Sequence, residues 1–167
     1  MIRVVVDDIA FVPADAVVRP TTDSLEPVSP ALRRLEQVGG PAFWKQLDPD
    51  QSLDIGAAVV TGAGDLAPEF VIHAVIRTRD EPVSATGVRR ALTSVLQRAV
   101  DWQLERLSVP LVGTGVGNLS AEDAARILVD VLVTDLERVT YPREVCIVVE
   151  TEEDRAFVEA CIQSRTS

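Results

Sequence analysis

The sequence contains few of the residues from which metal centres, disulfide frameworks and nucleic-acid surfaces are built. It has one histidine and two cysteines, Cys146 and Cys161, and no Cys-x-x-Cys pair. Neither a metal site nor a disulfide is therefore predicted, and no cofactor is expected. Lys45 is the only lysine, and the net charge is −10. Because duplex binding needs clustered cations to neutralise phosphates, these features argue against a broad nucleic-acid surface.

Long apolar runs are also missing. No stretch approaches the roughly 20 apolar residues that cross a bilayer, so no membrane span is expected. Asp7 and Asp8 interrupt the first apolar run before the core of a signal peptide could form. A cytoplasmic location is the expectation. The length of 167 residues, 47% of them hydrophobic, predicts a single domain over residues 1–167.

Apolar runs typical of strands alternate with segments of helical periodicity, which predicts an α/β domain. The strand-like runs are residues 4–6, 16–18, 57–60, 70–75, 107–112 and 145–149. Helices are predicted from Ser29-Pro30 to Gly39-Gly40, over a short stretch at 42–47, and over about 86–106, 120–139 and 151 onward.

A glycine-rich turn joins the strand at 107–112 to the following helix. It consists of Gly113, Thr114, Gly115, Val116, Gly117 and Asn118, and Ser120 then begins the helix. Small residues let a ligand approach the backbone, and free N–H groups at a helix N-terminus attract anions. A tight turn without a ligand has about equal weight for this segment taken alone.

Asp8 and Ile9 directly follow the first strand. There the Asp8 carboxylate is placed to accept a hydrogen bond from an adenine amino group, although a turn or cap residue is the favoured explanation on local grounds. His73 is the one histidine and lies among apolar residues of a predicted strand, so a core histidine is the favoured interpretation.

The order of these segments resembles the macro-domain family, whose members bind ADP-ribose. The matching segments are Asp7-Asp8-Ile9, Asp15-Ala16-Val17-Val18, Gly62 to His73, the loop of Gly113 to Asn118, and Glu122-Asp123-Ala124-Ala125. The resemblance implies a three-layer sandwich in which helices flank a mixed six-stranded sheet. It also implies that Asp8 and Ile9 hold the base and that residues 113–118 hold the phosphates.

The sequence departs from the family where the second strand ends. Members carry Asn-Ala-Ala-Asn there, whereas this chain has Arg19-Pro20-Thr21-Thr22, and residues 25–30 replace a run of glycines. Thr22 is too short to replace the asparagine amide, and prolines remove backbone donors. Gly117 and Asn118 stand where many members have an aromatic residue and a glycine. Arg19, beside the expected pocket, is predicted to pair a phosphate or to bridge Asp8 and Asp23.

Three functions remain open. The preferred one is binding of ADP-ribose or a related adenine nucleotide, weakened by the altered first loop. The second is an ADP-ribosyl hydrolase in which Asp23 or Thr22 replaces the missing catalytic residues. For these two side chains, however, hydrogen bonds within a local turn are the favoured explanation. The third is a scaffold of the same fold that binds no nucleotide and acts through protein contacts.

Overall fold

The computed structural model describes residues 1–46, 52–115 and 118–167. Its strands are β1 (Ile2–Val6), β2 (Ala16–Thr22), β3 (Ala58–Gly62), β4 (Phe70–Arg77), β5 (Arg106–Val109) and β6 (Glu144–Val149). Its helices are α1 (Pro30–Trp44), α2 (Ala85–Asp101), α3 (Ala121–Leu136) and α4 (Glu152–Thr166), and the short 3₁₀ helix η1 (Ile9–Phe11) follows β1.

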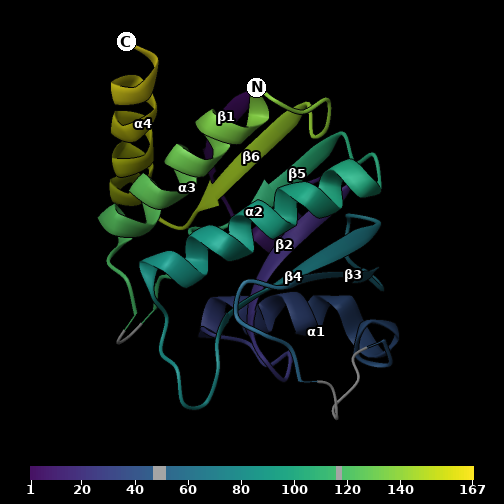
Figure 1. Cartoon of the computed structure of the whole chain (residues 1–167). Helices are drawn as coiled ribbons and strands as arrows, with labels where there is room; N and C mark the ends of the chain where they lie inside the picture. The colour runs from purple at the N-terminus through teal and green to yellow at the C-terminus, as the bar shows by residue number, and fades with distance from the viewer. Residues whose placement is uncertain (47–51, 116–117) are drawn as a thin grey trace.

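The strands form one six-stranded sheet in the order β1-β6-β5-β2-β4-β3 (Figure 1). All neighbouring strands pair in parallel except β3 and β4, which are antiparallel. The predicted mixed sheet is therefore confirmed, and each predicted strand corresponds to one strand of the structure. The carboxyl ends of β1, β6, β5 and β2 consequently meet at one edge of the sheet.

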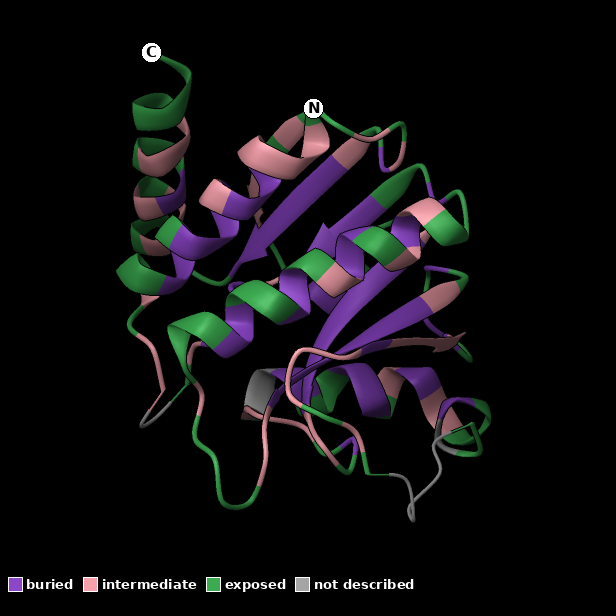
Figure 2. Cartoon of the chain, viewed as in Figure 1, coloured by how far each residue is buried: buried purple, intermediate pink, exposed green. Residues whose placement is uncertain are grey.

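Helices cover both faces of the sheet, which confirms the three-layer sandwich (Figure 1). Alternate side chains of β2 point to opposite faces of the sheet. Ala16 and Val18 pack with α2 and α3 on one face, whereas Val17 packs with α1 and η1 on the other. Val158 of α4 joins the first of these layers. Figure 2 shows the sheet buried almost throughout and the helices buried along one stripe each, as the strand and helix periodicities require.

Two boundaries differ from the prediction because of proline. β5 ends at Val109, before Pro110, whereas the predicted strand continued to residue 112. A proline has no N–H to donate to the ladder. β2 instead extends through Pro20 to Thr22, since at Pro20 it pairs with β4 on one side only.

The two helices predicted at residues 30–39 and 42–47 correspond to the two segments of α1, which meet at a kink. Gly40 has φ 70° and ψ −168° inside α1, and Pro41 begins the second part. Proline suits the first turn of a helix segment because its missing N–H would have no partner there. The predicted end at residue 47 lies outside the described residues.

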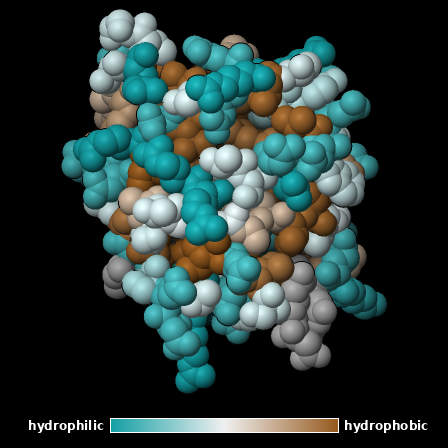
Figure 3. Space-filling view, viewed as in Figure 1, coloured by the Kyte–Doolittle hydropathy of each residue, from teal (hydrophilic) through white to brown (hydrophobic). Residues whose placement is uncertain are grey.

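Side-chain caps fix the starts of the other helices. Ser84, Ser120 and Thr151 accept hydrogen bonds from the N–H groups of Gly87, Asp123 and Asp154, respectively. In the view of Figure 3 the surface is hydrophilic, with scattered apolar areas between the charged side chains. Within the described residues, no helix combines the length and apolar character needed to cross a membrane. Both ends of the chain lie toward the edge of the sheet where β6 begins (Figure 1).

Candidate functional site

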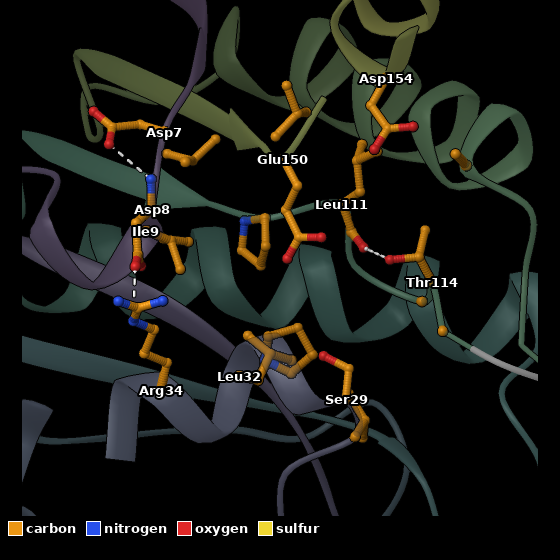
Figure 4. A pocket seen from close by; sticks show the side chains of 18 residues that line it. Asp7, Asp8, Ile9, Ser29, Leu32, Arg34, Leu111, Thr114, Glu150 and Asp154 are labelled. Atoms are coloured by element: carbon orange, nitrogen blue, oxygen red, sulfur yellow. Dashed lines mark hydrogen bonds and ion pairs between the residues drawn. The ribbon is translucent and has the colours of Figure 1, made fainter. Parts of the chain in front are cut away.

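A cavity of about 690 Å³ opens where the carboxyl ends of the parallel strands meet. Residues that directly follow β1, β6 and β5 line it, as does Pro20 near the end of β2. The first turns of α1, α3 and α4 border the same space, through Leu32, Ala121 and Asp154 (Figure 4). Clefts at this edge of an α/β sheet are common ligand sites, because strand ends and helix N-termini converge there.

Asp8 and Ile9 line one end of the cavity, as predicted from their position after the first strand. Asp8 Oδ1 accepts a hydrogen bond of 3.0 Å from the N–H of Ala10 and thereby caps η1. Its Oδ2 lies 3.0 Å from Nε of Arg34 on α1. Each carboxylate oxygen has further acceptor capacity, so Asp8 is both a cap and an available acceptor.

The glycine loop after β5 lines the opposite end of the cavity through Gly113, Thr114 and Gly115. Gly113 has φ 101° and Gly115 has φ 135°, values at which a side chain is strained. The loop closes on itself, since the N–H of Leu119 donates to the carbonyl of Gly113 over 2.9 Å. Ala121, at the start of α3, also lines the cavity. A strained glycine turn and the start of a helix thus meet at this end of the cavity, an arrangement typical of anion sites.

The remaining residues of the predicted loop have different places. Val116 and Gly117 lie outside the described residues. Asn118 is not among the residues that line the cavity. Its amide nitrogen donates to the carbonyl of Thr114 over 3.4 Å, and its backbone N–H donates to the carbonyl of Gly115 over 3.0 Å. Asn118 therefore stabilises the loop through hydrogen bonds to its backbone.

Arg19 does not lie where the sequence placed it. It is fully buried between the sheet and α1, and it does not line the cavity. Its Nη2 donates to Glu36 and, over 2.8 Å, to the carbonyl of Leu25. Arg19 does form an internal salt bridge, but its partner is Glu36 and the predicted bridge to Asp8 and Asp23 is wrong. Odd-numbered side chains of β2 face α1, where the carboxylate within reach is Glu36.

His73 belongs to the same buried network, which confirms that it is a core residue. Arg19 Nη1 lies 3.2 Å from Nδ1, and Thr61 Oγ1 lies 2.8 Å from Nε2. Because arginine only donates, Nδ1 must accept, and the proton is assigned to Nε2. Burial, and then the charge of Arg19, lower the pKa of His73 to about 3. The ring is therefore neutral at pH 7 and has both nitrogens satisfied.

Thr22 and Asp23 also lie outside the cavity. Thr22 Oγ1 accepts from the N–H of Glu26 over 3.1 Å, and the N–H of Asp23 donates to the carbonyl of Arg77 over 3.1 Å. Leu25 is buried in the left-handed region at φ 65°, with its carbonyl bound to Arg19. This segment makes the local turn bonds typical of Thr, Asp and Ser.

Several cavity residues were not predicted as site residues. They are Leu32 and Arg34 of α1, and Val148, Val149, Glu150 and Asp154 around the end of β6, whereas Val28 and Ser29 belong to the segment 25–30 that the sequence marked as altered. Glu150 was the most accessible to prediction, since it directly follows an apolar strand, as Asp7 and Asp8 follow theirs. Arg34 is the one cation among the lining residues.

Comparison with known proteins identifies relatives of this chain. The model of the Macro domain family matches residues 24–128. A macro domain-containing protein of Streptomyces coelicolor is 33% identical over 151 residues, which cover 83% of this chain and 86% of that protein. An uncharacterized protein of Mycobacterium tuberculosis is 28% identical over 73% of this chain, and the chain spans only 34% of that protein's length.

The fold is shared with solved structures as well. The Trypanosoma brucei macrodomain, solved in complex with ADP-ribose, superposes with a TM-score of 0.86 at 20% identity, covering 96% of this chain and 68% of that chain. The family model covers more than half of the sequence, and the relative from Streptomyces is matched over most of its length. The chain is therefore a member of the macro-domain family.

Proposed function

We propose that the cavity binds ADP-ribose or a related adenine nucleotide, with the base at Asp8 and Ile9 and the phosphates at Gly113–Gly115. The observation that carries this proposal is that two segments about a hundred residues apart line opposite ends of one cavity. One end offers a carboxylate acceptor and the other a strained glycine turn before a helix. Membership of the family supports the choice of ligand, as does the complex of the Trypanosoma relative with ADP-ribose.

We propose weak binding, because most of the backbone donors of the loop after β2 are engaged within the protein, which leaves Val28 and Ser29 as its residues at the cavity. The N–H groups of Thr22, Asp23, Leu25 and Glu26 all donate within the protein, and Pro27 has none. Glu122 and Asp123 in the first turn of α3 compete for its positive end. The expected dissociation constant is on the order of micromolar to millimolar, or about −4 to −8 kcal/mol.

We propose binding rather than hydrolysis, because the two side chains considered as replacement catalytic residues are not at the cavity. Thr22 and Asp23 lie outside the set of lining residues, and the hydroxyl of Thr22 is bound to the loop backbone. A general base must lie within hydrogen-bond reach of the proton it removes.

Calorimetric titration with ADP-ribose, ADP and AMP tests the proposal, with Gly115→Val as the decisive variant. Valine at φ 135° strains the turn, and its Cβ would lie 2.9 Å from the Asn118 amide. We expect at least a tenfold loss of affinity. Thr93→Val, on the exposed side of α2, is the matched control and should bind like the wild type. Failure of the wild type to bind any of these nucleotides at millimolar concentration would refute the proposal and favour a scaffold.

Replacing Asp8 with alanine should weaken nucleotide binding by about 1–3 kcal/mol, the range for losing a hydrogen bond to a charged group. Asp8→Ala also removes the cap of η1 and the partner of Arg34. Arg34→Met is therefore the control, since it breaks the same ion pair but keeps the carboxylate. Titration with AMP should show a loss for Asp8→Ala that exceeds the loss for Arg34→Met. Equal affinities of the wild type and a folded Asp8→Ala protein would place the base elsewhere.

A further inference from the structure

Glu150 occupies the middle of the cavity by virtue of the strand order. It directly follows β6, which lies between β1 and β5 in the sheet. Asp8 follows β1, and the glycine loop follows β5. Because β6 lies between β1 and β5, Glu150 lies between the segment that follows β1 and the segment that follows β5. Figure 4 shows its carboxylate pointing into the cavity between Ile9 and Thr114.

The carboxylate of Glu150 has no hydrogen bond or ion pair with any residue that the structure describes. Of the other acidic groups that line the cavity, Asp7 accepts from the N–H of Asp8, and Asp8 binds Ala10 and Arg34. Arg34, the cation of the cavity, is thus already paired. The carboxylate of Asp154, at the start of α4, has, like that of Glu150, no partner among the described residues. Apolar side chains line the space around Glu150, including Pro20, Leu32 and Leu111. An ionised carboxylate only accepts hydrogen bonds, so a ligand group that faces Glu150 must be a donor.

In a nucleotide, the group between the base and the phosphate is the ribose, and its 2′ and 3′ hydroxyls are donors. If the base lies at Asp8 and the phosphate at Gly113–Gly115, the ribose lies opposite Glu150. We propose that the Glu150 carboxylate accepts hydrogen bonds from these hydroxyls and makes the site selective for ribonucleotides over 2′-deoxyribonucleotides. This inference rests on the proposed function. It assigns Glu150 as a specificity-determining residue.

The negative charge of Glu150 has two opposite effects on nucleotide binding. It strengthens hydrogen bonds from hydroxyl donors, since bonds to an ionised acceptor are the stronger kind. It also repels the phosphates, which carry charge of the same sign at the neighbouring strand end. Removing the charge should therefore lower the selectivity for ribose over deoxyribose and at the same time raise the affinity for both nucleotides. This difference separates a contact with the ribose from a general electrostatic effect.

Titration of the wild type with ADP and 2′-deoxy-ADP tests the inference. We expect ADP to bind about tenfold more tightly, because 2′-deoxy-ADP lacks one of the hydroxyls that donate to the carboxylate and a hydrogen bond to a charged group is a strong one. In Glu150→Ala the two ligands should bind within about twofold of each other. Glu150→Gln keeps an acceptor without the charge, so it should bind both ligands more tightly than the wild type does and retain part of the selectivity. Asp154→Ala, which removes another carboxylate of the same cavity, should leave the ratio unchanged.

The outcomes separate this inference from the proposed function. Equal affinities of the wild type for the two sugars would overturn the role of Glu150 and leave nucleotide binding intact. A ratio that persists in Glu150→Ala would also overturn it, because the hydroxyl contact would then lie elsewhere. Absence of binding by both ligands would overturn the proposed function and the inference together. Glu150 is exposed, and thermal unfolding of each variant checks that the fold is retained.

Discussion

Glu36→Ala should lower the free energy of unfolding by about 3–5 kcal/mol, the cost of removing one partner from a buried ion pair. Arg19 is fully buried and Glu36 is 4% exposed. Without Glu36, the partners of the guanidinium among the described residues are neutral, and they include Thr21, Leu25 and His73. Burial already lowers the pKa of Arg19, and Glu36 opposes that effect. Urea denaturation of the variant, followed by circular dichroism, measures the loss.

Two control variants separate the buried charge from a general effect of mutation. Arg3→Ala breaks the exposed pair of Arg3 and Glu144, which are 2.8 Å apart, and should cost less than about 1 kcal/mol. The double variant Arg19→Met with Glu36→Met replaces the pair by apolar side chains and should recover most of the stability. A loss for Glu36→Ala no larger than that for Arg3→Ala would contradict the assignment of Glu36 as the counter-ion.

Gly64→Ala should destabilise the domain by about 2–5 kcal/mol, the sum of a left-handed conformation and overpacking. Gly64 has φ 58°, and an added Cβ would lie 2.3 Å from the carbonyl oxygen of Gly39 and 2.9 Å from the amide nitrogen of Phe43. Both atoms belong to the backbone of α1, which cannot move aside cheaply. The adjacent N–H of Asp65 also donates to the carbonyl of Gly39 over 3.0 Å. A thermal melt monitored by circular dichroism measures the effect.

Gly62→Ala is the matched control for Gly64→Ala. Gly62 lies in the same turn region but does not need a left-handed conformation, and its new Cβ would meet the end of the flexible Gln46 side chain. We expect a change of less than about 1 kcal/mol. Equal destabilisation by the two substitutions would show that the contact with α1 does not fix the turn.

Much of the fold was predictable because its signals are local. Apolar runs such as 70–75 and 145–149 are dense enough to be central strands, and capping residues such as Ser120 fix helix starts from sequence alone. The ends of β2 and β5 were less predictable, since they depend on which neighbouring strand a proline faces. Which strand lies beside the proline depends on the tertiary structure and cannot be read from a short stretch of sequence.

The site was predictable in part, for the same reason. Asp8 and the glycine loop are marked by their positions after strands, and both line the cavity. Arg19 was misplaced because the face of β2 to which it points follows from the register of the whole sheet. Glu150 was missed because its importance comes from the spatial order of β1, β6 and β5. That order differs from their order along the chain.

The position of the chain ends has an architectural consequence. The cavity opens at the carboxyl edge of the parallel strands, whereas α4 returns the C-terminus toward the edge where β1 and β6 begin, the edge at which the N-terminus also lies (Figure 1). A polypeptide joined to either end would therefore leave the molecule on the side opposite the cavity mouth. A fusion or a tether at either terminus would thus leave the opening of the cavity unobstructed.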